Sequence, residues 1–264
     1  MDATFLLTRG YTGLSKLKYL RLIRRNRSIA RIGHLQRNDV KHLIFHEGNI
    51  SRTDMIWIRK FSIVPIEFIS IEADFKLRSE DVWTGNSEFP LGYSLMCRFN
   101  YLQVWSYLAD YRVVCRLDED CTLRALPNFD DIETLIVGAL SDETHTQTNK
   151  TLPQHLEQLG LAGFYDHLFP YTNCYVTRVD FWKRTDVQNF LSEVGNHPEA
   201  LENRWGDLPI LGVALKAFGS WDAEAAVDPQ IMYRHGSHSS QVAGGVIQAQ
   251  GRPSIDNYTA IERR

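Results

Sequence analysis

Three consecutive acidic residues, Asp118, Glu119 and Asp120, have the residue types and spacing to bind a metal ion. They follow an apolar segment, residues 112–117, that has the character of a buried strand. Two Asp carboxylates at positions i and i+2 of a tight turn can approach one cation. Oxygen ligands of this kind suit Mg²⁺ or Mn²⁺, which can also bind a diphosphate. Acidic triplets at strand ends are also common as solvated turns, so the triplet alone leaves both interpretations open.

The segments that must position the triplet alternate between strand and helix. The pattern predicts strands at 3–8, 42–46, 66–71, 112–117, 132–139 and 174–176. It predicts helices at 15–32, 50–60, 92–107, 152–159, 182–194 and 207–218, and Asn49 or Ser51 can cap the second helix. Alternation with short connections favours parallel pairing. The expected fold is a single α/β domain with a mostly parallel central sheet flanked by helices, where ligands bind beyond the carboxyl ends of strands.

Composition excludes several classes of protein. The chain has 264 residues, of which 44% are hydrophobic and 23% charged, which is ordinary for a folded globular protein. No stretch approaches the ~18 apolar residues of a membrane span, and the first residues do not have the pattern of a secretory signal. The four cysteines have no zinc-binding spacing and are expected to be reduced and buried, which favours a reducing compartment: Cys97, Cys115, Cys121 and Cys174.

The net charge of −3 hides an asymmetry, because residues 1–50 contain ten Lys or Arg and three Asp or Glu. Seven of these basic residues lie within 16–31, among Leu14, Leu17, Leu20 and Ile23 at helical spacing. The segment is either a helix with a core-facing apolar stripe and a solvated basic face, or a surface for anionic lipid or another polyanion. Nucleic acid is not expected, because no DNA-binding motif accompanies the helix.

Five short segments follow one another in an order that is typical of a known family: GYSLMCRF at 92–99, RLDED at 116–120, DFW at 180–182, RWGDLP at 204–209 and YRH at 233–235. They resemble the segments Y-R-x-M-C-R-F, W-R-V-E-P-D, D-F-W, R-W-G-D-A-P and G-Y-x-H of the fungal α-1,2-mannosyltransferases of glycosyltransferase family 15. The resemblance covers a little over half of the chain. It implies a GT-A-like fold, GDP-mannose as donor, manganese (or magnesium) as the metal and retention of anomeric configuration.

The resemblance also implies roles for individual residues. Asp118, Asp120 and His235 match the metal site, and a neutral imidazole suits Mn²⁺ beside carboxylates. If they share one ion, Asp120 and His235 should lie within about 8 Å of each other. The other implied roles are donor binding by Tyr93, Arg98 and Asp118, and acceptor binding by Arg204, Trp205 and Asp207, of which Asp207 is also catalytic.

Two departures from the family matter. The family has a Glu, a candidate nucleophile, where an ungapped alignment places Tyr175, and no alignment supplies a carboxylate. Tyr175 is therefore a catalytic candidate by position, but a Tyr phenol, with a pKa of about 10, is a poor nucleophile. A front-face route is favoured over a covalent one, for which Asp180 and Asp207 are the nearest carboxylates by motif. The family's N-terminal membrane anchor is also missing. We therefore expect the protein in the cytoplasm or on the cytoplasmic face of a membrane, and in the Golgi lumen only if an anchor was removed.

The sequence as a whole predicts a metal-dependent glycosyltransferase that transfers a sugar to a hydroxyl of a glycan or glycolipid. Residues 1–90 are expected to be the nucleotide-binding half and 91–235 the metal and acceptor half, followed by a loosely attached Gly/Ser-rich tail, 236–264. Two other classes stay open. One is a non-catalytic GT-A-like module that binds a nucleotide, a glycan or an anionic membrane surface. The other is a metal-dependent nucleotidyltransferase.

Overall fold

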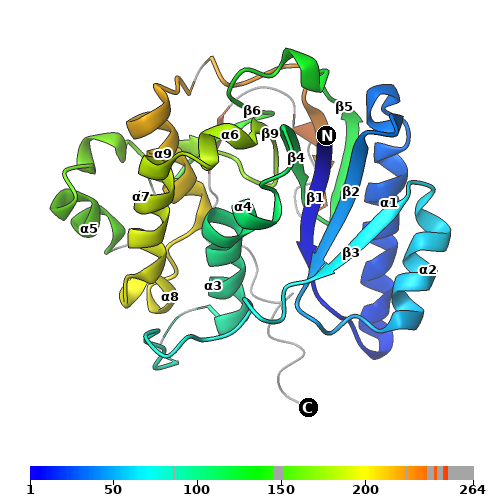
Figure 1. The fold of residues 1–264 in the computed structure, drawn as a ribbon, viewed down its shortest axis with the longest axis horizontal. Helices are drawn as coiled ribbons and strands as arrows, with labels where there is room; N and C mark the ends of the chain where they lie inside the picture. Colours follow the sequence, from blue (N-terminus) through cyan, green and yellow to red (C-terminus); the bar gives the residue numbers. More distant parts are fainter. Residues whose placement is uncertain are drawn as a thin grey trace.

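A six-stranded sheet in the order β3-β2-β1-β4-β9-β6 runs through the protein (Figure 1). The computed structural model describes residues 1–85, 87, 89–144, 151–223, 225–236, 241–242 and 246–248. Parallel pairs join β1 to β2 and β4, and β2 to β3, whereas β9 is antiparallel to both β4 and β6. The predicted α/β fold with a mostly parallel central sheet is confirmed. The strands are β1 Asp2–Thr8, β2 Val40–His46, β3 Ile66–Ser70, β4 Val113–Leu117, β6 Leu135–Val137 and β9 Cys174–Arg178.

Helices cover both faces of this sheet, because its strands are apolar on both sides. In β1, Phe5 belongs to the hydrophobic core on one face and Leu6 to the core on the other, as the twofold alternation of a strand requires. One face is covered by α1, Tyr19–Ile29, and α2, Arg52–Ser62, which lie side by side in Figure 1. The helices on the other side are α3 Leu91–Arg98, α4 Val104–Tyr107, α5 Leu152–Gln158, α6 Val179–Trp182, α7 Thr185–Asn196, α8 Glu199–Glu202 and α9 Asp207–Gly219.

Two small sheets bring the end of the chain back to its middle. In one, β10, Met232–His235, is antiparallel to β5, Cys121–Ala125, and to β11, Gln241–Val242. In the other, β7, Leu140–Asp142, pairs with β8, Leu168–Pro170, and with β12, Val246–Gln248. The predicted tail, 236–264, lies mostly outside the described residues, and its described parts include β11 and β12.

Several predicted boundaries were wrong. The helix expected at 182–194 starts later, as α7 at Thr185, and Trp182 instead ends the short helix α6. Between them Arg184 is extended and donates a hydrogen bond to the Phe218 carbonyl (2.9 Å) near the end of α9. The strand expected at 132–139 is reduced to β6. The helix expected at 92–107 is confirmed, although a π-helical turn, Phe99–Gln103, separates α3 from α4. Ser51, rather than Asn49, caps α2 by accepting a hydrogen bond from the Asp54 N–H (3.1 Å).

The structure of the first predicted helix, residues 15–32, contradicts the prediction that its leucine stripe faces the core. Its start is a 3₁₀ helix, Gly13–Lys18, and Leu14, Leu17 and Leu20 are exposed by 87%, 64% and 47%. Residues spaced by three drift by about 60° per step around an α-helix, so only Ile23 reaches the buried side. Arg25, counted with the basic face, is instead buried and donates hydrogen bonds to the carbonyls of Leu117 (3.0 Å) and Phe5 (3.2 Å).

Two further observations concern the cysteines and the length of the helices. All four cysteines are free and buried, as expected from their spacing. Within the part of the chain that the structure describes, no helix is long and apolar enough to cross a membrane.

Candidate active site

The acidic triplet lies where two neighbouring parallel strands end. From β1 the chain passes outward to β2 and β3, whereas β4 lies on the opposite side of β1, so the direction of winding changes between β1 and β4. In open α/β sheets, ligands bind beyond the carboxyl ends of strands at such a point. Glu119 bridges the two strand ends, since it accepts hydrogen bonds from the Tyr11 hydroxyl (2.5 Å) and from the Thr8 hydroxyl. These two contacts join the loop after β1 to the triplet.

Asp120 lies beside His235, which is 115 positions later in the chain. The Asp120 Oδ1 and His235 Nε2 atoms are 3.3 Å apart, so the expected proximity of the two side chains is confirmed. Strand β10 makes this contact possible, because its register pairs His235 with Cys121. The Tyr233 hydroxyl anchors β10 by donating a hydrogen bond to Asn173 Oδ1 (2.6 Å). Burial alone would lower the pKa of His235, but the hydrogen bond and charge of Asp120 raise it.

The residues around Asp120 fit a divalent cation. One ligand atom each from Asp120, Cys121 and His235 lies within 4.8 Å of the others. Carboxylate and imidazole are suitable ligands for Mn²⁺ or Mg²⁺, whereas burial raises the pKa of the Cys121 thiol well above its ordinary value and keeps it neutral. Gly236 leaves room here, since a Cβ at that position would lie 3.2 Å from Asp120 Oδ2. Asp120 and His235 are therefore the two side chains best arranged to hold the ion.

Asp118 belongs to a second chain of contacts, which sequence reasoning missed. The buried Arg116 donates from Nε to Asp118 Oδ1 (3.0 Å) and from Nη1 to Asp207 Oδ2 (2.5 Å). Thr172 donates to the same Asp207 oxygen (3.2 Å). Burial alone would lower the pKa of Arg116, but the charges of Asp118 and Asp207 raise it well above its ordinary value. Arg116 thus connects the acid predicted for the metal with the acid predicted for the acceptor. The sequence did indicate the contact between Arg116 and Asp118, because residues two positions apart in a strand lie on the same face.

Tyr175 is fully buried next to Arg116. The two residues face each other in the antiparallel register of β4 and β9. Burial raises the pKa of the Tyr175 phenol, although the charge of Arg116 opposes the shift. Its hydroxyl makes no hydrogen bond of ordinary geometry to a described residue. A neutral, buried phenol at this position lacks the properties of a nucleophile.

Tyr93 and Arg204, predicted for donor and acceptor respectively, are in direct contact. Arg204 Nη2 donates to the Tyr93 hydroxyl (3.0 Å), and the guanidinium lies over the rings of Phe89 (4.2 Å) and Tyr93 (4.7 Å). Arg204 has a positive φ of 45°, a left-handed conformation that is strained for a residue with a side chain. This left-handed residue lies two positions before Gly206, the N-cap of α9, and so belongs to the turn that leads to Asp207.

Trp205 does not have the surroundings predicted for an acceptor platform. Its side chain is 1% exposed and donates a hydrogen bond from Nε1 to Thr151 (3.0 Å). Its ring stacks with His155 and His197, at centroid distances of 5.1 and 4.8 Å. A sugar cannot reach a ring that is buried to this extent, so Trp205 is a core residue in this structure and does not contact the acceptor as predicted.

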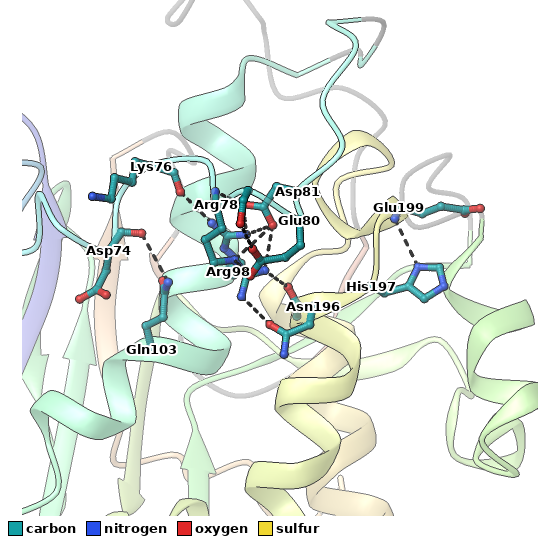
Figure 2. Close-up of polar contacts among 12 residues, drawn as sticks. Asp74, Lys76, Arg78, Glu80, Asp81, Arg98, Gln103, Asn196, His197 and Glu199 are labelled. Atoms are coloured by element: carbon teal, nitrogen blue, oxygen red, sulfur yellow. Dashed lines mark hydrogen bonds and ion pairs between the residues drawn. The ribbon is translucent and has the colours of Figure 1, made fainter.

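Arg98 has a structural partner where a donor phosphate was predicted. It is 1% exposed, and its Nη1 lies 2.7 Å from both carboxylate oxygens of Asp81 (Figure 2). Its Nη2 donates to the Lys76 carbonyl (3.0 Å), and Arg78 donates to the same Asp81. Burial would raise the pKa of Asp81, but the hydrogen bonds from Arg78 and Arg98 lower it to about 2. Arg98 therefore holds the segment after β3 against α3, and this contact replaces its predicted role.

Comparison with known proteins gives similarity in structure without similarity in sequence. No protein-family model matches the chain, and no curated protein sequence matches it. Core-mannan synthase A from Aspergillus fumigatus, solved in a Mn/GDP form, is similar with a TM-score of 0.70 at 13% identity, over 89% of this chain and 74% of that chain. The mannosyltransferase Ktr4p from S. cerevisiae, solved in complex with GDP, gives a TM-score of 0.66 at 14% identity, over 89% and 70% of the two chains. The chain thus has the GT-A fold of glycosyltransferases, and its likeness to family 15 stays a resemblance.

Proposed function

We propose that this protein is a metal-dependent glycosyltransferase that transfers mannose from GDP-mannose, with retention, to a hydroxyl of a glycan or glycolipid. The observation that carries the proposal is the 3.3 Å contact between Asp120 and His235 at the carboxyl end of β4. A carboxylate and an imidazole from distant segments meet there, at the point of a GT-A fold where ligands bind. The Mn/GDP form of one structural neighbour and the GDP complex of another support the choice of metal and nucleotide.

The residues at the carboxyl ends of β1 and β4 and those in contact with them would have different roles. Asp120 and His235 would hold the divalent ion, with Asp118 as a further ligand or a neighbour through water. When bound, a divalent ion neutralises charge on a diphosphate and so makes it a better leaving group. Glu119 holds Tyr11 and Thr8 at the end of β1, where the nucleoside is expected. Asp207, fixed by Arg116 and Thr172, orients the acceptor hydroxyl.

Retention of the anomeric configuration would result from a front-face route. The bond between the anomeric carbon and the diphosphate oxygen breaks, the acceptor oxygen bonds to the same face of that carbon, and the acceptor proton passes to the departing diphosphate. The state of Tyr175 supports this choice, because burial raises the pKa of its phenol and keeps it neutral. A covalent route would need a charged nucleophile at that position.

A panel of nucleotide sugars tests the proposal. The protein is incubated with each sugar nucleotide in Mn²⁺ or in EDTA, and free nucleoside diphosphate is measured with and without glycan acceptors. We expect Mn²⁺-dependent release of GDP from GDP-mannose, with slow hydrolysis even without acceptor. Preference for another sugar nucleotide would correct the donor and keep the enzyme class.

Three other results would overturn the proposal. Tight nucleotide binding without turnover would identify a non-catalytic module. Release of pyrophosphate in place of a nucleoside diphosphate would identify a nucleotidyltransferase. Turnover that is equal in Mn²⁺ and EDTA would remove Asp120 and His235 from the role of metal ligands.

A further inference from the structure

The two helices on one face of the sheet carry an unusual surface, here called the α1–α2 surface. It consists of the exposed side chains of residues 13–31 and 51–63. Within the described part of the chain, ten large hydrophobic side chains are exposed, and six of them belong to this surface: Leu14, Leu17, Leu20, Ile56, Phe61 and Ile63. The same two segments contain ten basic residues and one acid, Asp54, which pairs with Lys16 (3.0 Å). Exposed apolar groups are thus concentrated where positive charge is concentrated.

The apolar and basic side chains share one side of α1. Leu20, Arg24 and Arg27 are exposed and follow one another at intervals of four and three within α1, which aligns them along one stripe of the helix. The exposed Leu17 and Arg31 lie just before and just after this helix. The second helix continues this surface, because Arg27 Nε donates to the Phe61 carbonyl (2.7 Å). A groove of about 330 Å³ lies along the basic part of the stripe, lined by Leu20, Ile23, Arg24, Arg27, Ser28, Arg31 and Thr122.

Ile63 adds an independent observation. It ends α2 with a φ of 74°, a conformation that a β-branched residue rarely adopts, and its side chain is 72% exposed. Glycine would occupy this position without strain. An exposed apolar side chain held in a strained conformation adds nothing to the core, and a contact outside the chain would explain it.

We propose that the α1–α2 surface binds the face of a membrane that contains anionic lipid. Leucine and isoleucine side chains at these positions enter the boundary between headgroups and acyl chains, while the arginines bind lipid phosphates. The groove beside Arg24, Arg27 and Arg31 has room for a headgroup. Charge complementarity selects the occupant. Of the ten basic residues only Arg25 is buried, and the one acid is paired with Lys16, so the surface favours an anionic bilayer over a neutral one.

The position of this surface gives it a consequence that rests on the proposed function. Leu14 follows three residues after Tyr11, whose hydroxyl bonds Glu119 of the acidic triplet. A membrane bound at Leu14 therefore lies beside the acidic triplet, and the acceptor would be a hydroxyl presented at the lipid surface. Membrane binding itself needs neither the donor nor the metal, so the two proposals can fail separately.

Vesicle flotation tests the surface directly. The protein is mixed with vesicles of neutral phosphatidylcholine, or with vesicles that also contain about 30% phosphatidylserine, at about 0.1 M and 0.5 M salt. We expect binding to the anionic vesicles at low salt, at least tenfold weaker binding to the neutral ones, and release by salt. No binding, or equal binding to both kinds of vesicle, would overturn the proposal.

Matched variants separate the two contributions. Leu14→Ser, Leu17→Ser and Leu20→Ser together, or Arg21→Gln, Arg24→Gln and Arg31→Gln together, should each weaken vesicle binding at least tenfold. The control replaces three exposed apolar residues elsewhere, Leu77, Val82 and Phe164, by Ser, and should bind as the wild type does. An equal loss in the control would show a general effect of hydrophobicity and overturn the assignment.

Ile63→Gly provides a variant that cannot fail merely through misfolding. Removal of the strained conformation should raise the melting temperature, while loss of the apolar side chain should weaken vesicle binding severalfold. Self-association is the competing explanation of this surface. A dimer of the wild type that dissociates in the triple leucine variant, without vesicle binding, would replace the membrane by a second copy of the chain.

Discussion

Two regions of the molecule contain the segments that resemble family 15, and their charged groups have different surroundings. In the strand-end region, residues 116–120 and His235, several like charges meet, and burial raises the pKa of both Asp118 and Glu119. In the helix-side region, around Arg98 of α3 and Trp205 before α9, Arg98 is bound by Asp81, and Trp205 stacks with two imidazoles that also contact each other. The comparison shows that a residue type that matches the family's motif does not by itself establish that the residue binds donor, acceptor or metal. Carboxylates crowded at strand ends can gain from a bound cation, whereas an ion pair that is already complete cannot.

The largest expected effect tests the helix-side region. Arg98→Met leaves Asp81 as a buried carboxylate with one cationic partner fewer, because both side chains of the pair are at most 5% exposed. Removing one partner of a buried pair costs about 3–5 kcal/mol of unfolding free energy. Urea unfolding should show this loss, while the folded protein keeps its affinity for nucleotide within about twofold.

The double variant Arg98→Met with Asp81→Asn is the matched control, since it removes both charges and should recover part of the lost stability. Unchanged stability together with lost nucleotide binding would return Arg98 to the donor site.

The next effect tests the strand-end region. Asp120→Asn removes a charged ligand from the proposed metal site and should weaken Mn²⁺-dependent binding of GDP by about 10- to 100-fold, measured by calorimetry. Asp180→Asn is the control, because Asp180 is exposed and pairs only locally with Arg178. Identical metal dependence in the Asp120 variant and the control would exclude Asp120 as a ligand.

The sequence predicted the strand-end region better than the helix-side region, for a physical reason. An apolar strand followed by acids is a local pattern, and in a parallel sheet it also fixes where the acids lie. The partners of Arg98 and Trp205 are 8 to 54 residues away in irregular segments or other helices, so no local pattern reveals them. The contact of Arg116 with Asp118 could have been inferred from their spacing of two, but the sequence gives no sign that Arg116 also reaches Asp207, which is 91 residues away. The short strand β10 has too few residues for a periodic signal, and only the family motif indicated His235.

A smaller effect compares two imidazoles. His235 gains a carboxylate partner, whereas His42, on β2, is buried beside Thr4 and its pKa is lowered by burial to about 4. Between pH 6.5 and about 4, the unfolded chain binds a proton at His42 that the folded chain does not bind. The free energy of unfolding therefore falls by up to about 1.4 kcal/mol per pH unit as the pH decreases through this range.

In His42→Gln, the free energy of unfolding should decrease less steeply as the pH falls from 6.5 to about 4. Above pH 7, where His42 is neutral in both the folded and the unfolded chain, its titration makes no contribution to the difference between the two proteins. Other histidines with lowered pKa, His34, His46 and His155, contribute to the wild-type slope, so the difference between the two proteins isolates His42. Parallel pH profiles for the wild type and the variant would show that His42 is not neutral in the fold.

The smallest expected effect decides how the strand-end region performs transfer. Tyr175→Phe removes a buried hydroxyl that makes no ordinary hydrogen bond and keeps the edge contact of the ring with Phe5 (6.3 Å). On a front-face route, kcat/KM for mannose transfer should stay within about threefold, below roughly 0.7 kcal/mol of barrier. Asp207→Asn, which weakens the link to Arg116, should lose far more activity in the same assay. A loss of more than about a hundredfold in Tyr175→Phe, some 2.7 kcal/mol, would mean that the phenol takes part in transfer, and the front-face route would have to be replaced.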